Sequence, residues 1–174
     1  MSNENGPFET IALINDKMDF SKFDCGNTDF NDFIRTDALK DFIEDYSVTY
    51  VGMVSGKPAA FVSLIAAAYQ TKNIYEKGSE EFQYQQIPAI KIARIATDRT
   101  CQNKGCGEYL IDHSAAIALK IKKYVGCKLM VTDALPEKIK WYEKRGFKLS
   151  IDRKRTEAGR ENYPMHAFLP PVKK

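Results

Sequence analysis

The sequence lacks a hydrophobic run long enough to cross a membrane, and it lacks a secretory signal at its beginning. Its longest apolar stretch, Ala59 to Tyr69, is interrupted by Ser63 and falls short of the roughly 20 residues that a spanning helix requires. The first residues, Met-Ser-Asn-Glu-Asn-Gly-Pro, carry neither the basic patch nor the apolar stretch of a signal peptide. We therefore expect a cytoplasmic protein with no membrane partner.

Cysteine is also scarce, and its spacing matches no metal motif. The four cysteines, Cys25, Cys101, Cys106 and Cys127, form no CxxC pair and no zinc-ribbon pattern. Cys101 and Cys106 with His113 would make a metal site that lacks a fourth ligand. We expect reduced thiols, no structural disulfide and no metal.

What is present is the composition of an ordinary globular domain with an uneven charge. The 174 residues are 44% hydrophobic and 28% charged, which predicts one folded domain over residues 1–174. Residues 1–45 carry 4 basic and 11 acidic side chains, whereas residues 91–174 carry 19 basic and 9 acidic ones. The second half suits a polyphosphate or a nucleic-acid backbone, although a merely solvated basic surface has the same composition.

The first half predicts a helix followed by a hairpin. Asn27 or Thr28 can cap a helix, and its apolar side chains recur at helical spacing. These are Phe30, Phe33, Ile34, Ala38, Phe42 and Ile43. Two strand-like segments, residues 48–54 and 58–69, then flank the short link Ser55-Gly56-Lys57, which predicts antiparallel pairing. The polar stretch 70–86 reads as a loop on the substrate side.

The second half alternates strands and helices. We expect a central strand over 87–98, a helix over 105–124 and a short strand over 128–132. One stripe of the long helix should face the core, and its members are Leu110, Ser114, Ile117, Ile121 and Tyr124. A further helix over 135–145 begins near Pro136 and ends before Gly146. Strands over 147–151 and 165–169, around a charged loop over 152–163, complete a mixed α/β fold.

The segment with the strongest chemical signal lies between the central strand and the long helix. It reads Gln102-Asn103-Lys104-Gly105-Cys106-Gly107-Glu108. Glycines remove side chains that would block a phosphate, and the first turn of a helix offers unpaired N–H groups and a partial positive charge. This order of strand, glycine-rich turn and helix predicts a pyrophosphate site, although two glycines alone could also be a simple turn.

Three other phosphate loops do not fit this segment. A Walker loop requires Gly-Lys-Ser/Thr, whereas Glu108 and Tyr109 follow the second glycine here. A dinucleotide fingerprint requires a small residue where the chain has Leu110. The partner motifs of a protein kinase are absent from the sequence.

The surroundings of this loop resemble the GNAT superfamily of N-acetyltransferases. Arg94-Ile95-Ala96-Thr97-Asp98, followed by Gln-Asn-Lys-Gly-Cys-Gly, is similar to that family's coenzyme-binding strand and loop. Trp141-Tyr142-Glu143-Lys144-Arg145-Gly146-Phe147 is similar to its closing Tyr-Glu-Lys-x-Gly-Phe segment. The resemblance covers Lys91 to Phe147 and implies a mostly antiparallel sheet flanked by helices.

The resemblance also implies roles for individual residues, with acetyl-CoA as the cosubstrate. Backbone groups of Ile95, Ala96 and Thr97 would meet the pantetheine arm and polarise the thioester. The loop would hold the pyrophosphate through Gln102, Asn103, Lys104, Gly105, Cys106, Gly107 and Glu108. Tyr142 would protonate the departing thiolate as general acid, although it could instead be a packing aromatic. Of the two neighbours we expect Trp141 to be the core residue.

The sequence provides no obvious general base and does not identify the amine. The strand over 90–97 holds no Asp or Glu, which leaves Asp98, Glu108 or water as proton acceptors. His113 is expected to be half-exposed on its helix. Since an α-amine is more readily neutral than a lysine side chain, the sequence favours an α-amino substrate.

Within the superfamily the chain is similar to the acetyltransferase toxins of bacterial toxin–antitoxin pairs, which acetylate the α-amine of aminoacyl-tRNA. It shares Phe-Asp-Cys-Gly-Asn before an acidic helix, Thr-Tyr-Val in a strand and Val-Thr-Asp-Ala before Trp-Tyr-Glu-Lys. It departs from them at Ala60-Phe61-Val62-Ser63, where those toxins carry a Gly-Tyr-Tyr pattern. The resemblance makes tRNA an alternative substrate, and a homodimer is compatible with it. A non-catalytic acyl-CoA-binding module and a nucleic-acid binder are the other classes considered.

Overall fold

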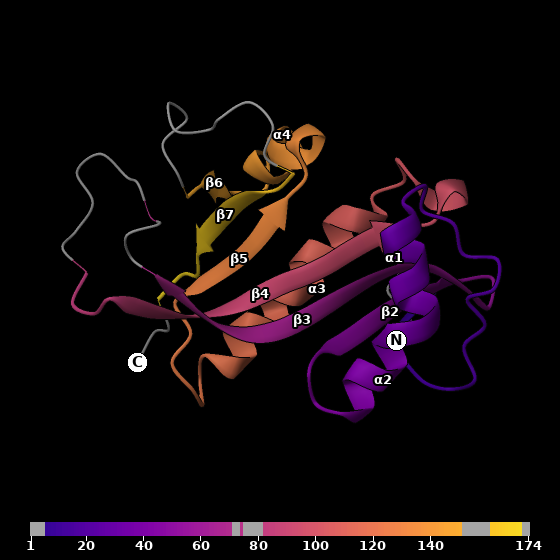
Figure 1. The fold of residues 1–174 in the computed structure, drawn as a ribbon, viewed down its shortest axis with the longest axis horizontal. Coiled ribbons are helices and arrows are strands. Elements are labelled where there is room, and N and C mark those ends of the chain that lie inside the picture. Colours follow the sequence, from indigo (N-terminus) through magenta and orange to yellow (C-terminus); the bar gives the residue numbers. More distant parts are fainter. Residues whose placement is uncertain (1–5, 71–73, 75–81, 151–160, 172–174) are drawn as a thin grey trace. The chain divides into compact units, whose positions relative to one another are not determined.

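The computed structural model describes residues 6–70, 74, 82–150 and 161–171. Seven strands form one sheet in the order β1-β2-β3-β4-β5-β7-β6 (Figure 1). Two compact units divide the chain, one made of residues 1–65 and 93–114 and the other of residues 66–92 and 115–174. The boundaries between the two units fall within three elements: β3, Lys57–Gln70; β4, Gln86–Thr97; and α3, Cys106–Ile121.

The first unit contains the predicted hairpin, preceded by a strand that the sequence did not reveal. The strand β2, Val48–Val54, pairs antiparallel with β3, Lys57–Gln70. Between them Ser55 and Gly56 have φ angles of 50° and 68°, as a two-residue hairpin turn of type I′ requires. The extra strand β1, Thr10–Leu13, pairs antiparallel with β2 and is too short for its alternation to stand out.

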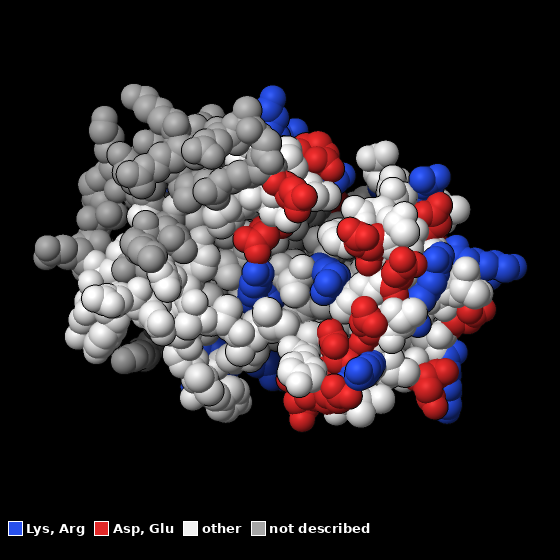
Figure 2. Space-filling model, viewed as in Figure 1, with Lys and Arg blue, Asp and Glu red and all other residues white. Residues whose placement is uncertain are grey.

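The predicted first helix is present but changes its winding. Asn27 caps α1, Thr28–Asp32, by accepting a hydrogen bond from the Phe30 N–H. A π-helical stretch, Phe33–Asp37, joins α1 to α2, Ala38–Ile43. The exposed residues of the whole segment include Asp29, Asp32 and Asp37, and acidic side chains gather over the α1–α2 region on the face shown in Figure 2. Phe33, Ile34 and Ala38 of the segment are buried in a core cluster. The cluster consists of Ile14, Phe20, Phe23, Phe33, Ile34, Ala38, Val51, Phe61 and Ala96.

The central strand and the long helix match their predictions closely. The strand β4, Gln86–Thr97, is followed by a 3₁₀ turn, Arg99–Cys101, and by α3, Cys106–Ile121. Leu110 and Ser114 are fully buried. The expected core position of Tyr124 is wrong, because α3 ends before it and its side chain is 82% exposed.

The second unit holds the remaining elements. The strand β5, Leu129–Ala134, pairs parallel with β4 and antiparallel with β7, Tyr163–Phe168. The predicted helix over 135–145 is a 3₁₀ turn, Pro136–Lys138, followed by the single α-turn α4, Ile139–Glu143. The short strand β6, Lys148–Leu149, pairs with β7. Residues 152–160 of the expected loop over 152–163, and most of the loop over 70–86, lie outside the described residues. Tyr163, expected at the end of the first loop, is the first residue of β7.

Candidate active site

The turn before α3 has the geometry expected of an anion site. Asn103 and Gly105 have positive φ angles of 61° and 81°. The first intrahelical bond is donated by the Tyr109 N–H to the Gly105 carbonyl, at 3.0 Å. The N–H groups at the start of the helix therefore precede its hydrogen-bond ladder, and the helix dipole favours an anion beside them. This fits the phosphates of a coenzyme, to which Cys106 and Gly107 would present their backbone N–H groups.

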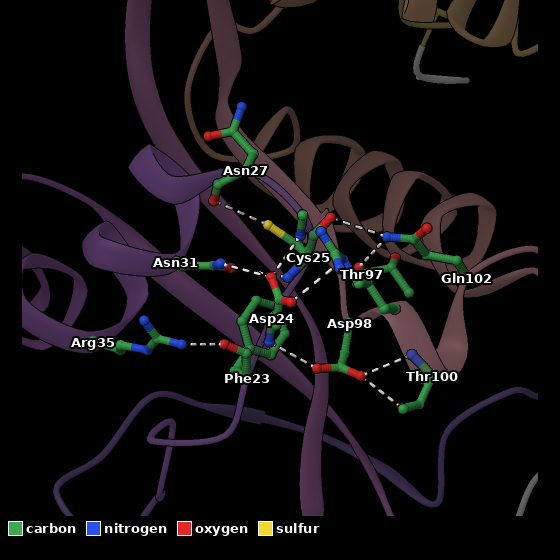
Figure 3. Close-up of polar contacts among 12 residues, drawn as sticks. Phe23, Asp24, Cys25, Asn27, Asn31, Arg35, Thr97, Asp98, Thr100 and Gln102 are labelled. Atoms are coloured by element: carbon green, nitrogen blue, oxygen red, sulfur yellow. Dashed lines mark hydrogen bonds and ion pairs between the residues drawn. The ribbon is translucent and has the colours of Figure 1, made fainter.

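Two polar side chains of this loop donate to backbone carbonyls outside it. Gln102 donates from Nε2 to the carbonyls of Thr97 and Cys25, at 3.1 Å each. Lys104 donates from Nζ to the Thr100 carbonyl at 2.8 Å. Gln102 thus joins the end of β4 to the loop, so the predicted strand and loop residues lie together within the first unit. Figure 3 shows the two Gln102 contacts.

The predicted pantetheine strand is the last part of β4. Ala96 is buried in the core of the first unit, while Ile95 and Thr97 are half-buried. The register of β4 with β5 runs from Ala89 to Ile92, so within the described chain it stops short of residues 95–97. Backbone groups on this part of β4 are thereby left outside that ladder.

Tyr142 lies in the second unit and is 4% exposed. Its ring packs edge-on against Trp141 and Phe147, with centroid distances of 4.8 and 5.3 Å. Burial raises the pKa of its phenol, which a hydrogen bond with the Thr132 side chain opposes in part. The Thr132 hydroxyl in turn donates to the Ile92 carbonyl at 3.1 Å. The phenol is thus held in a fixed position and keeps its proton at neutral pH.

The expectation that Trp141 is the core residue of the pair is wrong. Trp141 is half-buried, whereas Tyr142 is buried. Successive residues of a helix point about 100° apart, so the single turn of α4 can direct only one of the two rings inward. Trp141 instead covers the guanidinium of Arg145, whose Cζ lies 4.0 Å from the ring centroid.

The structure narrows the choice of proton acceptor. Burial alone would raise the pKa of Asp98, but hydrogen bonds from Asp24 and Thr100 outweigh it and lower that pKa. His113 is half-buried, as expected, and burial lowers its pKa. Its ring lies 5.0 Å from that of Tyr50, edge-on. Asp98 is thus a weak base. Glu108, the other carboxylate considered as a proton acceptor, is exposed at the start of α3.

Neither a metal cluster nor a membrane span is found in the described part of the chain. Over residues 6–70, 74, 82–150 and 161–171, no three His, Cys, Asp or Glu side chains are grouped as metal ligands. No helix in these ranges has both the length and the apolar character needed to cross a bilayer. All four cysteines are free thiols.

A surface of the second unit combines lysines with aromatic rings, which the sequence did not indicate. The Phe82 and Phe168 rings are stacked at 6.3 Å, and the Lys128 Nζ lies 5.5 and 6.0 Å from their centroids. Lys122 connects the end of α3 to this region by donating to the carbonyls of Leu169 and Pro170. We call Phe82, Lys128 and Phe168 the basic–aromatic face. Lys120, Lys123 and Tyr124 are exposed residues at the end of α3 and just beyond it, in the same unit.

Two functional features were recoverable only in part from the sequence. Thr132 lies in the Val-Thr-Asp-Ala segment, which was noted for its resemblance but not for a contact with Tyr142. Asp24 lies in the Phe-Asp-Cys-Gly-Asn segment, whose contact with Asp98 joins residues 74 positions apart. Neither spacing is periodic, so no sequence pattern pairs them.

Solved structures with this fold include bacterial toxins. A tyrosine-to-phenylalanine mutant of the toxin KacT superposes with a TM-score of 0.80 at 21% identity, covering 92% of this chain and 94% of that one. The toxin AtaT, complexed with acetyl-methionyl-tRNAfMet, gives 0.77 at 23% identity with the same coverage. At these identities the likeness establishes the fold.

Sequence comparison gives the family. A curated relative from Mycobacterium tuberculosis, described as a tRNA-acetylating toxin, is 22% identical over 139 residues, which are 80% of each chain. The family model described as an acetyltransferase (GNAT) domain matches residues 45–149, more than half of this chain. The chain therefore belongs to the GNAT family of N-acetyltransferases, which take the acetyl group from acetyl-CoA.

Proposed function

We propose that this enzyme acetylates the α-amine of aminoacyl-tRNA in the cytoplasm. The observation that carries the choice of acceptor is the likeness, over 80% of the chain, to a relative described as a tRNA-acetylating toxin. AtaT is also described in complex with the C-terminus of the antitoxin AtaR. An antitoxin partner for this chain is part of the proposal.

We assign two roles to residues of this chain, coenzyme binding in the first unit and proton donation in the second. The start of α3, from Asn103 to Glu108, binds the pyrophosphate of acetyl-CoA with its backbone N–H groups, and Ile95 to Thr97 bind the pantetheine amides. Acetyl-CoA supplies an activated thioester. Tyr142 delivers its proton to the sulfur as the C–S bond breaks and the new C–N bond forms. The proton that the amine loses returns through solvent, so Tyr142 is restored.

An α-amine depends less on a general base than a lysine side chain does. An α-amine has an ordinary pKa of about 7.7 to 8.0, against about 10.4 for a lysine side chain. At neutral pH a useful fraction of the α-amine is already neutral and can attack without assistance. This agrees with the lowered pKa of Asp98, which leaves that carboxylate a poor proton acceptor.

The basic–aromatic face supports RNA as the carrier of the amine. Lysines contribute phosphate contacts, and exposed rings provide surfaces on which bases stack. Tyr124 is 82% and Phe168 41% exposed, and Lys128 lies beside the Phe168 ring. Lys128 and Phe168 thus set a basic side chain beside an exposed ring, the pairing that a nucleic-acid surface uses.

Reversing the charge of Lys128 on this face, together with that of Lys123 just beyond α3, should separate tRNA from small acceptors. In Lys123→Glu/Lys128→Glu we expect kcat/KM for charged tRNA to fall by about tenfold or more, with a shallower salt dependence, because phosphate contacts are lost. Acetylation of a small peptide amine should be unchanged. Lys57→Glu, an exposed lysine of the hairpin turn, is the matched control. Equal losses with both acceptors, or none with tRNA, would contradict the assignment of this face.

The pH dependence tests the phenol directly. The active form of Tyr142 is protonated, and burial raises its pKa from the ordinary value of 10.0. Activity is therefore retained below that pKa and lost as the pH rises through it. With a small amine acceptor, we expect no alkaline fall in kcat below about pH 10. A descending limb between pH 8 and 9 would assign proton donation to another group.

A further inference from the structure

The segment from Phe23 to Asn27, called the Asp24 segment below, lies against the end of β4 (Figure 3). The proposed chemistry does not use it. Two hydrogen bonds donated by backbone N–H groups fix this contact. The Asp24 N–H donates to Oδ2 of Asp98 at 2.9 Å, and the Arg99 N–H donates to the Asp24 carbonyl at 2.8 Å. The segment therefore touches the chain just before the phosphate loop begins.

Asp98 is the junction of this contact. Its Oδ1 accepts from both the N–H and the hydroxyl of Thr100, at 2.9 and 2.6 Å, while Oδ2 accepts from Asp24. The Asp98 N–H donates to the Ala59 carbonyl on β3 at 2.8 Å. Asp98 thus ties the Asp24 segment and the 3₁₀ turn together through its carboxylate, and β3 through its backbone N–H.

Asp24 fixes the shape of its own segment. Its Oδ1 accepts from the Gly26 N–H and from Nδ2 of Asn31, at 2.9 Å each. Its Oδ2 lies 3.3 Å from Nε of Arg99. Gly26 has a φ of +87°, and a Cβ there would lie 3.2 Å from that nitrogen. A side chain at position 26 would therefore be strained and would displace Arg99.

Gln102 completes the connection on the ligand side. Its amide bridges the Cys25 and Thr97 carbonyls, so the first residue of the phosphate loop is held by the Asp24 segment and by β4. Immediately beyond it, Asn103 and Gly105 adopt positive φ angles. Positive φ angles are uncommon outside glycine, although Asn adopts them more readily than most residues, and a glycine also adopts many other angles. Holding Gln102 in place therefore reduces the number of backbone conformations that residues 103–105 can adopt.

We propose that Asp98 and Gln102 are positioning residues that, with the Asp24 segment, hold the phosphate loop in its binding geometry before acetyl-CoA arrives. The proposal rests on the proposed function, since it requires the coenzyme phosphates at this loop. A preformed loop avoids the ordering cost of binding. Loss of this preformed geometry weakens binding of the phosphates and leaves the acetyl-transfer step unchanged.

The test compares acetyl-CoA with S-acetyl-pantetheine, which has the reacting thioester but no pyrophosphate. The variants are Asp98→Asn, which turns an amide N–H₂ toward an N–H donor, and Gln102→Met, which deletes both donated bonds. We expect each to raise the KM for acetyl-CoA about tenfold, as for the loss of one or two hydrogen bonds. We expect kcat, and both constants for acetyl-pantetheine, to change by less than about twofold.

Asp19→Asn is the matched control, because Asp19 accepts from the nearby Ser21 N–H at 2.9 Å in an exposed turn of the same unit. It should leave both donors unaffected. Turnover of acetyl-pantetheine reports the folded fraction of each variant, so a loss of stability is separated from a loss of positioning.

Three results would overturn the inference, and they differ in what else they affect. If the variants keep the wild-type preference for acetyl-CoA, the positioning role is wrong while the proposed function stands. If kcat falls with both donors, Asp98 or Gln102 acts at the reacting end. If the wild-type enzyme shows no preference for acetyl-CoA, the phosphates are not bound at this loop, and the proposed site fails as well.

Discussion

Tyr142→Phe should lower kcat by about 10²- to 10⁴-fold, the usual contribution of a general acid, while the Kd for acetyl-CoA stays nearly constant. The substitution keeps the ring that packs against Trp141 and Phe147 and deletes only the phenolic proton. Single-turnover kinetics and equilibrium binding measure the two quantities separately.

Two further variants, Trp141→Phe and Thr132→Val, serve as the control and as an intermediate case for this result. Trp141→Phe keeps an aromatic ring beside Tyr142, so we expect near-normal turnover. Thr132→Val keeps the buried shape but removes the hydroxyl that bonds Tyr142, so kcat should fall by several-fold, less than for Tyr142→Phe. Near-normal turnover in Tyr142→Phe would show that water or another side chain protonates the thiolate.

The second large effect concerns the phosphate loop. At 100 times its Kd, acetyl-CoA should stabilise the native enzyme by about 2.7 kcal/mol, a rise in Tm of about 5 to 11 °C for a domain of this size. Gly107→Trp should abolish this rise, because an indole at the second residue of α3 would fill the space in front of the helix N–H groups. Thermal melts with and without acetyl-CoA measure it.

Gly126→Trp is the matched control for that experiment. Gly126 is exposed beyond the other end of α3, and a Cβ there would meet only Pro88, at 3.8 Å. The control should melt with the full acetyl-CoA shift. An undiminished shift in Gly107→Trp would place the coenzyme phosphates elsewhere.

The parts of the fold that were predicted from the sequence are those with strong local signals. The hairpin at Ser55-Gly56, the Asn27 cap and the helix following Gly105 all depend on residues within one or two turns of each other. The π-helical stretch Phe33–Asp37 was missed because the change of winding depends on how Phe33 and Ile34 pack in the core, which is a tertiary contact. The short strand β1 was missed because four residues define no period.

The site divides in the same way. The phosphate loop is contiguous, so its position before a helix could be predicted from its own glycines and from the helix pattern that follows. The burial of Tyr142 in place of Trp141 depends on the direction of α4, which packing decides. The contact of Asp24 with Asp98 closes a loop of 74 residues, and nothing in either local sequence specifies the other partner.

The most direct test of the proposed function is to identify the atom that receives the acetyl group. Labelled acetyl-CoA is incubated with the enzyme and total charged tRNA, and the recovered RNA is treated with mild alkali, which cleaves the aminoacyl ester. We expect the label to be released as N-acetyl amino acid. Deacylated tRNA, and charged tRNA whose α-amines are already blocked, should accept none. Label that stays on the polynucleotide, or that appears only on lysine side chains or small amines, would contradict the proposal.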